Sequence, residues 1–231
     1  MTTPLVGTSA GRVAIVTGGT RGVGRATIGR LVALGYAVVV DYLHDQRAAE
    51  STVETVLAYH GTAMAVRADV ADGLDVERLF AETIVAFGCV DAVVHTVDGR
   101  IASTPVADVD LDEFDAVCRL NTRATLIVNR EAARRVRDGG AIVNLSSSTV
   151  GSASPTFGAY AASKAATDVL TRVLAVELRH RDITVNAVSV HVDRPCVPDR
   201  VAELIVHLLA VDGPRVTGRM IRVDEAFPGT T

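Results

Sequence analysis

Short apolar segments alternate along the chain with longer segments of helical periodicity, and this alternation constrains the fold more than any other feature of the 231 residues. The apolar segments are continuous, as expected for strands that are covered on both faces. A strand and a helix recur about every 25–30 residues, which predicts βαβ units and a parallel sheet. Right-handed crossovers then place helices on both faces of that sheet.

The expected elements form one α/β, doubly wound domain over residues 1–231, with residues 1–10 as a flexible N-terminus, because no linker, low-complexity tract or charge run divides the chain. The strands are expected at Arg12–Thr17, Tyr36–Asp41, Thr62–Arg67, Val90–His95, Ala141–Leu145, Ile183–Val190 and Met220–Val223. The helices are expected at Gly22–Leu34, Asp45–Tyr59, Asp72–Phe87, Asp112–Arg137, Tyr160–His180 and Pro198–Ala210.

Composition excludes several classes of protein. Lys and Arg number 23 against 27 Asp and Glu, and aromatic residues make up 4% with no Trp, so we expect no nucleic-acid partner. No apolar run approaches the roughly 20 residues that span a bilayer, and no signal-peptide pattern is visible, so we expect a cytoplasmic protein without membrane association. Cys89, Cys118 and Cys196 are too scattered for a disulfide framework or a zinc site, and no metal is expected.

A glycine-rich segment, Thr17–Gly24 (TGGTRGVG), joins the first expected strand to the first expected helix. A helix N-terminus offers unpaired N–H groups and the positive end of the helix dipole, and glycines let a pyrophosphate approach those groups. A tight turn without a ligand is the alternative. The strand-to-helix position favours a dinucleotide-binding loop.

Tyr160 and Lys164 lie four residues apart at the start of an expected helix, so both side chains share one face. A phenol is a poor acid–base group at neutral pH because its ordinary pKa is about 10. A neighbouring ammonium favours the phenolate and lowers that pKa toward the working range. Taken alone, the pair could also be a half-buried tyrosine beside a solvated lysine.

These motifs, taken together and in order, resemble the short-chain dehydrogenase/reductase family from about Arg12 to Val223. The resemblance implies a Rossmann-type domain with a parallel seven-stranded sheet. It also implies an NAD(P)(H)-dependent oxidoreductase that transfers a hydride between nicotinamide and a carbonyl or secondary alcohol, nearest to the 3-oxoacyl-carrier-protein reductase-like branch. The matching positions are TGxxxGxG at Thr17–Gly24, Asp69 and Val70 after the third strand, Asn121 on a helix, Asn144–Ser147 ending the fifth strand, and YxxxK at Tyr160–Lys164.

The resemblance further implies a role for each catalytic position. Tyr160 exchanges a proton with the substrate oxygen, Lys164 also holds the nicotinamide ribose, and Asn121 helps to hold a water that links the lysine to solvent. A serine hydrogen-bonds the substrate oxygen, and among Ser146–Ser148 we choose Ser147 because it precedes Tyr160 by 13 positions, as is common in the family. Cofactor contacts are implied for Gly18, Thr20, Arg21, Gly22, Val23, Gly24, Asp41, Tyr42, His44, Asp69, Val70, Tyr160 and Lys164.

The second expected strand bears on the choice of cofactor. NAD-binding members usually place an acid seven positions after the glycine that ends the first helix, which from Gly35 is Tyr42, so Asp41 falls one position short and faces the other way. Arg21 resembles the basic residue of NADP-preferring members, and His44 adds a partial charge. We therefore expect NADP(H), with NAD(H) as the alternative if Asp41 reaches the ribose.

Three departures from the family pattern stand out. The fourth strand usually ends NNAG but here reads His95–Asp98 (HTVD) followed by glycine, and Asp98 is electrostatically unwelcome beside a cofactor unless it points away or meets Arg100. The sixth strand runs into Val188–Pro195, without the usual Pro-Gly pair and threonine. The usual lid is shortened to Arg194–Pro198, which predicts an open cleft and a bulky or carrier-borne substrate, or weak catalysis.

Two interpretations of the protein's function therefore stay open. The first is an active reductase of a small-molecule or carrier-bound carbonyl, and the second is a cofactor-binding pseudoenzyme or regulatory subunit, which the three departures motivate. The resemblance also implies a homodimer or homotetramer. Val169, Val173 and Val176 form an apolar stripe that either serves such an interface or faces the sheet.

Overall fold

The computed structural model describes residues 11–152, 154–191, 197–209 and 215–223, and within them the chain forms one seven-stranded sheet. All neighbouring strands are parallel, in the order β3-β2-β1-β4-β5-β6-β7. The expected doubly wound sheet is confirmed. The strands are β1 (Val13–Thr17), β2 (Ala37–Tyr42), β3 (Ala63–Arg67), β4 (Ala92–His95), β5 (Ala141–Ser147), β6 (Thr184–Val190) and β7 (Met220–Arg222).

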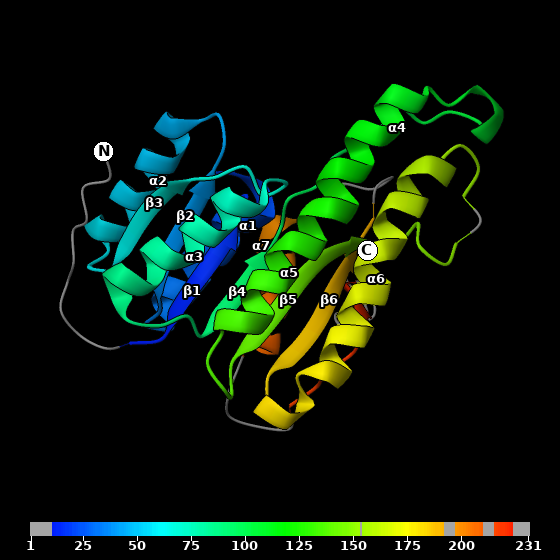
Figure 1. The fold of residues 1–231 in the computed structure, drawn as a ribbon. Helices are drawn as coiled ribbons and strands as arrows, with labels where there is room; N and C mark the ends of the chain where they lie inside the picture. Colours follow the sequence, from blue (N-terminus) through cyan, green and yellow to red (C-terminus); the bar gives the residue numbers. More distant parts are fainter. Residues whose placement is uncertain (1–10, 153, 192–196, 210–214, 224–231) are drawn as a thin grey trace.

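Helices cover both faces of the sheet, and each face has its own apolar core (Figure 1). One core packs β-strand valines against α1 (Gly22–Ala33), α2 (Gln46–Ala58) and α7 (Pro198–Leu208). The other packs the opposite side chains of the same strands against α3 (Gly73–Phe87), α5 (Ala124–Arg135) and α6 (Gly158–Glu177). The strands are predominantly apolar because both of their faces are buried, and their polar residues gather mainly toward their carboxyl ends, as at Asp41, His95 and Ser146–Ser147.

The segment expected as one helix over Asp112–Arg137 is interrupted. It consists of α4 (Leu111–Cys118), a π-helical turn over Arg119–Arg123 and α5. α4 begins where the side chain of Asp110 accepts a hydrogen bond from the amide of Glu113. The wider turn holds Asn121, whose buried side chain forms hydrogen bonds with a neighbouring loop and with α6. These tertiary hydrogen bonds leave no trace in the apolar periodicity of the sequence, so the turn could not be predicted from it.

The strand β5 is longer than expected and ends at Ser147 instead of Leu145. Parallel pairing with β6 continues to Ser146 and Ser147, and the amide of Ser148 still donates to the carbonyl of Val190. The serine expected to act is therefore held at the end of a hydrogen-bonded ladder. This placement restricts the motion of its backbone.

Strand order reverses between β2 and β4, which lie on either side of β1. In open α/β sheets, ligands bind in the crevice outside the carboxyl ends of the strands at such a reversal. The glycine-rich segment follows β1, and the segment around Asp98, which differs from the family pattern, follows β4. Both segments therefore lie at this crevice. Among the described residues, no helix combines the length and apolarity needed to cross a membrane.

Candidate active site

A groove of about 570 Å³ opens at the carboxyl ends of β1, β2, β3 and β4 and reaches β5 and β6. It falls within the usual range of roughly 300–1,000 Å³ for cofactor sites. All eleven cofactor positions expected before Tyr160 line it: Gly18, Thr20, Arg21, Gly22, Val23, Gly24, Asp41, Tyr42, His44, Asp69 and Val70. Other residues on the same walls belong to segments that the sequence had singled out without assigning them a cofactor contact: Thr96, Val97, Asp98, Arg100, Leu145 and Val190. Sequence reasoning did not single out the remaining lining residues, which are Leu43, Asp45, Ala68 and Leu120.

The glycine-rich segment fits a diphosphate. Gly18 and Gly22 have positive φ angles of 69° and 52°, and a Cβ added at Gly22 would meet no atom within 4 Å, so the loop is open above it. A Cβ at Gly24 would lie 2.3 Å from the Gly18 carbonyl oxygen, so the helix packs too tightly on the loop for a side chain. α1 has no side-chain cap and no acid in its first turn, which leaves its N-terminal amides to an anion.

Asp41 lies beneath this loop. Its carboxylate is 3% exposed; one oxygen accepts a 3.4 Å hydrogen bond from the Gly18 amide and the other has no partner. Burial, only partly offset by that hydrogen bond, raises the pKa of Asp41 to about 8. At neutral pH the site therefore presents mainly a neutral carboxyl at the end of β2.

The groove wall after β3 is fixed by an ion pair. Arg119 donates to Asp69 at 2.9 Å, and the amide of Ala71 donates to the same carboxylate. Burial raises the pKa of Asp69, but these two hydrogen bonds together hold it below its usual value. Asp69 is thus ionised and fixed, and the neighbouring Val70 supplies an apolar wall.

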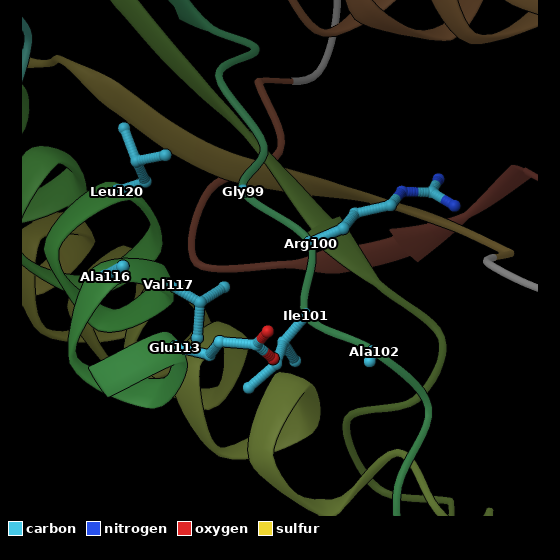
Figure 2. A pocket seen from close by; sticks show the side chains of 8 residues that line it. All are labelled: Gly99, Arg100, Ile101, Ala102, Glu113, Ala116, Val117 and Leu120. Atoms are coloured by element: carbon cyan, nitrogen blue, oxygen red, sulfur yellow. The ribbon is translucent and has the colours of Figure 1, made fainter. Parts of the chain in front are cut away.

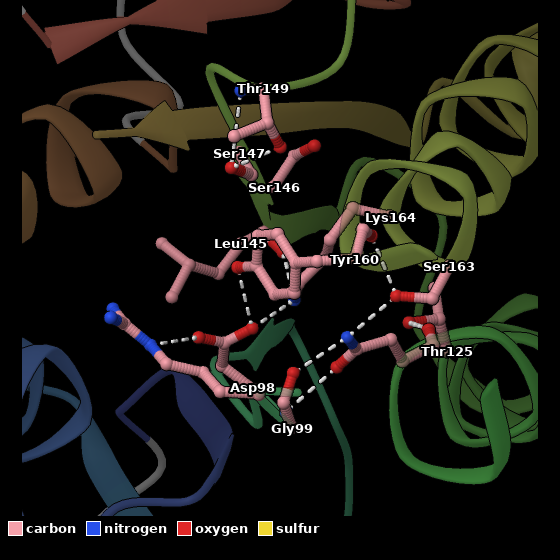
Figure 3. Close-up of polar contacts among 12 residues, drawn as sticks. Asp98, Gly99, Thr125, Leu145, Ser146, Ser147, Thr149, Tyr160, Ser163 and Lys164 are labelled. Carbon is pink, nitrogen blue, oxygen red and sulfur yellow. Dashed lines mark hydrogen bonds and ion pairs between the residues drawn. The ribbon is translucent and has the colours of Figure 1, made fainter. Parts of the chain in front are cut away.

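Tyr160 and Lys164 are not among the residues that line the groove, but both contact Asp98, which does line it (Figure 3). The Tyr160 hydroxyl donates to Asp98 Oδ1 at 2.9 Å, and Lys164 Nζ lies 3.0 Å from the same oxygen. Lys164 Nζ also donates to the carbonyl of Leu145 at 3.3 Å. Both α6 side chains are buried, and Asp98 forms a further 3.4 Å pair with the exposed Arg100. Of the two arrangements expected for Asp98, the contact with Arg100 is present. Asp98 does not point away from the site, however, because it also contacts Tyr160 and Lys164.

Burial and Asp98 act together on the two titrating groups. Burial raises the pKa of Tyr160, and the charge and hydrogen bond of Asp98 raise it further, while the hydroxyl of Ser147 lowers it. Burial lowers the pKa of Lys164, and Asp98 opposes that effect. The expected lowering of the phenol pKa by the lysine is therefore not the net result in this cofactor-free chain.

The three consecutive serines point to different partners. Ser146 donates to Asp168 at 2.5 Å, and Ser148 lies 3.1 Å from Nδ1 of His191. Ser147 accepts a hydrogen bond from the Thr149 amide and also interacts with Tyr160. Among these hydroxyls, it is Ser147 that bears on the phenol.

Asn121 holds a loop and the start of α6. Its amide group exchanges two hydrogen bonds with the backbone of Gly99, at 2.7 and 2.8 Å, and donates to Ser163 at 2.9 Å. Gly99 follows Asp98 directly, so the π-helical turn fixes the loop that carries this carboxylate. The structure places no direct bond between Asn121 and Lys164 among the hydrogen bonds of the described residues.

His95, at the end of β4, is a residue to which the sequence assigned no role. It is 1% exposed, its Nδ1 lies 2.7 Å from the Thr17 hydroxyl, and its Nε2 has no partner. Burial, with a smaller effect of Lys164, lowers the pKa of His95 to about 3, so the ring is neutral. Its signal was the departure from NNAG, the same signal that marks Asp98.

A smaller cavity of about 270 Å³ adjoins the groove between the loop after β4 and α4 (Figure 2). Gly99, Arg100 and Leu120 border it, and Arg100 and Leu120 also line the main groove. Ile101, Ala102 and Val117 give it apolar walls. Of the shortened lid, residues 194–196 lie outside the described residues.

A parallel sheet with a glycine-rich loop at its strand-order reversal, together with a buried Tyr–Lys pair, defines a dinucleotide-dependent oxidoreductase. The profile of the family described as short chain dehydrogenase matches residues 12–192. The chain is 41% identical to versicolorin reductase 1 of Aspergillus parasiticus over 180 residues, 78% of this chain and 68% of that protein. The chain belongs to the short-chain dehydrogenase family.

Solved structures agree with this assignment. A dehydrogenase/reductase from Sinorhizobium meliloti superimposes with a TM-score of 0.85 at 32% identity, over 93% of this chain and 94% of that one. A blue fluorescent protein from a metagenomic library, in complex with NADPH, gives a TM-score of 0.85 at 30% identity, over 95% of this chain and 98% of that one. The protein is therefore an NAD(P)(H)-dependent oxidoreductase that acts on a small molecule, and the pseudoenzyme reading is not favoured.

Proposed function

We propose that this chain reduces a carbonyl compound to an alcohol with NADP(H), using Tyr160 as the proton donor. One observation carries the proposal: a groove lined by an uncapped helix N-terminus is also lined by Asp98, and Asp98 contacts Tyr160 and Lys164, with Ser147 beside Tyr160. A site for a diphosphate and a group that can donate a proton to a carbonyl thereby lie next to one groove.

Each residue has a distinct part in this chemistry. Ser147 donates to the substrate oxygen and fixes it beside Tyr160, which gives its proton to that oxygen. Lys164 supplies the positive charge that stabilises the phenolate and holds ribose hydroxyls, and Asn121 positions the Gly99 loop. A bound nicotinamide cofactor supplies the hydride and is held by the glycine-rich loop, the end of β2, Asp69 and Val70.

The preference for NADP(H) rests on charge at the end of β2. Arg21 is exposed at the start of α1 and lines the groove, so a 2′-phosphate meets its positive charge, and the exposed His44 offers a hydrogen-bond donor nearby. Asp41 is buried and mainly neutral, and so does not offer an exposed carboxylate to a ribose. The NADPH complex of the metagenomic protein supports the same preference. NAD(H) is the alternative.

We propose a bulky substrate, either a free polycyclic carbonyl compound or an acyl chain on a carrier protein. The name of a hydroxynaphthalene reductase-like protein that is 38% identical to this chain supports the former, and the resemblance to 3-oxoacyl-carrier-protein reductases supports the latter. We also propose that the whole chain is one domain, that it is a cytoplasmic homodimer or homotetramer, and that its shortened lid leaves the cleft open.

Replacing Tyr160 by Phe tests the proposed function. We expect Y160F to lose turnover by about 10²–10⁴-fold, the usual contribution of general acid catalysis. Binding of NADPH, followed by nicotinamide fluorescence, should stay within about twofold, because the groove keeps its other contacts. Y59F is the matched control, since Tyr59 is 79% exposed on the surface and should leave both unchanged.

Parallel titrations of NADPH and NADH decide the cofactor. Tighter NADPH binding that weakens in Arg21→Gln supports the proposal, whereas tighter NADH binding assigns the ribose contact to Asp41.

Unchanged turnover in Y160F would refute Tyr160 as the proton donor. Binding of NADPH without turnover of any carbonyl would favour the pseudoenzyme.

A further inference from the structure

Asp98 occupies a position where a carboxylate is chemically costly. It is the acid that contacts both groups proposed to move the proton, at 2.9 Å from the Tyr160 hydroxyl and 3.0 Å from Lys164 Nζ (Figure 3). The family pattern has no carboxylate here, so neither the glycine-rich loop nor the YxxxK spacing accounts for it. Its loop is fixed by the paired hydrogen bonds between Gly99 and Asn121.

The hydrogen bond has a direction, and this direction matters. A carboxylate has only acceptors, so the Tyr160 hydroxyl must be the donor and its proton must point at Asp98. If Tyr160 lost that proton, two anionic oxygens would face each other at hydrogen-bonding distance. Like charges this close disfavour ionisation of the second group.

Other charged groups around the pair do not cancel this effect. Lys164 offsets the charge of Asp98, so that the three groups carry no net charge while Tyr160 is protonated. Arg100 from the same loop is largely exposed and therefore screened by water. Asp168 on α6 adds negative charge near Lys164, and His95 on β4 is neutral. Ionisation of Tyr160 would leave the cluster with net negative charge in a buried place.

We propose that Asp98 is a positioning residue that keeps the proton on Tyr160, so that the site stays ready to protonate a carbonyl oxygen up to a more alkaline pH. In reduction, the carbonyl carbon gains a hydride from the reduced cofactor, the carbonyl oxygen gains the Tyr160 proton, and solvent returns a proton to Tyr160. Oxidation requires the opposite starting state, a phenolate that accepts the alcohol proton. This inference rests on the proposed role of Tyr160 as the proton donor.

The titration of Tyr160 in the cofactor-free protein tests the inference without any need for turnover. Tyrosine labelled with ¹³C at Cζ reports each phenol by NMR, and the signal missing from Y160F identifies Tyr160 among the four tyrosines. Asp98→Asn keeps the shape and an acceptor oxygen but removes the charge. We expect the apparent midpoint of Tyr160 to fall by about one pH unit or more in D98N.

The pH dependence of carbonyl reduction supplies the second readout. Reduction needs the protonated phenol, so kcat/KM for reduction falls at alkaline pH as Tyr160 loses its proton, and this alkaline limb should move down by about one pH unit in D98N. A merely structural role would lower the rate of reduction without moving the limb. Glu54→Gln removes one exposed charge from α2 and serves as the control for net charge.

The outcomes separate this inference from the proposed function. A Tyr160 midpoint that is unchanged or higher in D98N overturns the inference, whatever the activity. A lower midpoint together with an alkaline limb of carbonyl reduction that moves to lower pH supports it. A lower midpoint in a protein that turns over no carbonyl supports the effect of Asp98 on the proton and refutes the proposed function instead. Asp98→Gly also removes the charge and replaces D98N if the latter does not fold.

Discussion

Asp41 is a buried acid whose ionisation the folded chain resists. One of its carboxylate oxygens has no partner, and the other meets only the amide of Gly18. A carboxylate with so little hydrogen bonding is expensive to bury, so the neutral form prevails in the folded state. The residue that determines the charge at the end of β2 thus links cofactor recognition to stability.

We predict that Asp41→Asn removes a pH-dependent loss of stability. The folded pKa of about 8 lies above the unfolded value of 3.8, so the folded chain binds the extra proton and its stability falls as pH rises from 4 to 8. The difference in free energy of unfolding between D41N and the wild type should therefore shift in favour of D41N by about 3–4 kcal/mol between pH 5 and pH 8. Urea unfolding without cofactor at both pH values measures it.

Asp45→Asn is the matched control for that experiment. Asp45 is exposed and caps α2 by accepting a hydrogen bond from Ala48, so its removal should alter stability without a comparable widening over this range. An equal gap between D41N and the wild type at the two pH values would contradict the prediction.

At this same scale, sequence predicts residue identity better than residue orientation. Tyr160 and Lys164 could be placed on one face because helical spacing dictates it. Asp98 could be singled out, yet its contact with both of them depends on the path of a loop that Asn121 fixes from another part of the chain. The buried, unpartnered state of Asp41 likewise depends on how the glycine-rich loop folds over β2.

The π-helical turn is the element that joins the two halves of the site. Its Asn121 side chain satisfies both the amide and the carbonyl of Gly99, and the neighbouring Thr122 hydroxyl donates to the carbonyl of Ser163 on α6. One turn thus holds the loop after β4 and the start of α6 in register. π-helical turns occur often at functional sites.

We predict that Asn121→Leu destabilises the chain by about 2–4 kcal/mol, because it leaves two buried backbone groups without partners at about 1–3 kcal/mol each. Turnover should fall further than stability alone explains, since Asp98 loses its fixed loop. Thermal unfolding and steady-state rates at a temperature where both proteins are folded measure the two effects.

Thr122→Val is the control for this element. It removes a single hydroxyl that donates to Ser163 and leaves the Gly99 loop intact, so we expect a loss of at most about 1.5 kcal/mol. If T122V and N121L had equal effects on turnover, the π-helical turn would be a general packing element rather than the support of the Asp98 loop.

Periodicity predicted the helices but not this turn. Residues 112–137 show one continuous helical pattern, and the structure keeps the helical course while widening it at Asn121. The reason is a tertiary hydrogen bond, which adds nothing to the apolar period. The extension of β5 to Ser147 has a similar cause, because pairing with β6 outlasts the apolar run.

At the scale of the whole molecule, the parallel sheet with helices on both faces was the most predictable feature. Continuous apolar strands require cover on both faces, and right-handed crossovers between parallel strands supply it. The two apolar cores, one on each face of the sheet, are the result. The sequence could not decide which helical faces stay uncovered, because each crossover helix must bury only one of its faces.

We predict that the uncovered apolar faces of α5 and α6 form an interface between copies of the chain. Val169, Val173 and Val176 are 52%, 48% and 65% exposed, so this stripe faces away from the sheet, and Leu126 on the adjacent α5 is 51% exposed. Neighbouring apolar side chains left in water favour association. Light scattering should therefore give two or four chain masses.

Val173→Glu should shift that mass toward one chain, because an ionised carboxylate in the centre of the stripe would have to be buried without a partner on association. Val85→Glu is the matched control: Val85 is 88% exposed on α3, a helix separated from α6 by α5, so the mass should not change. A wild-type protein that scatters as one chain at micromolar concentration would reject the interface. A V173E protein that keeps the wild-type mass would move the interface away from α6, since a dimer that buried this stripe could not tolerate the charge.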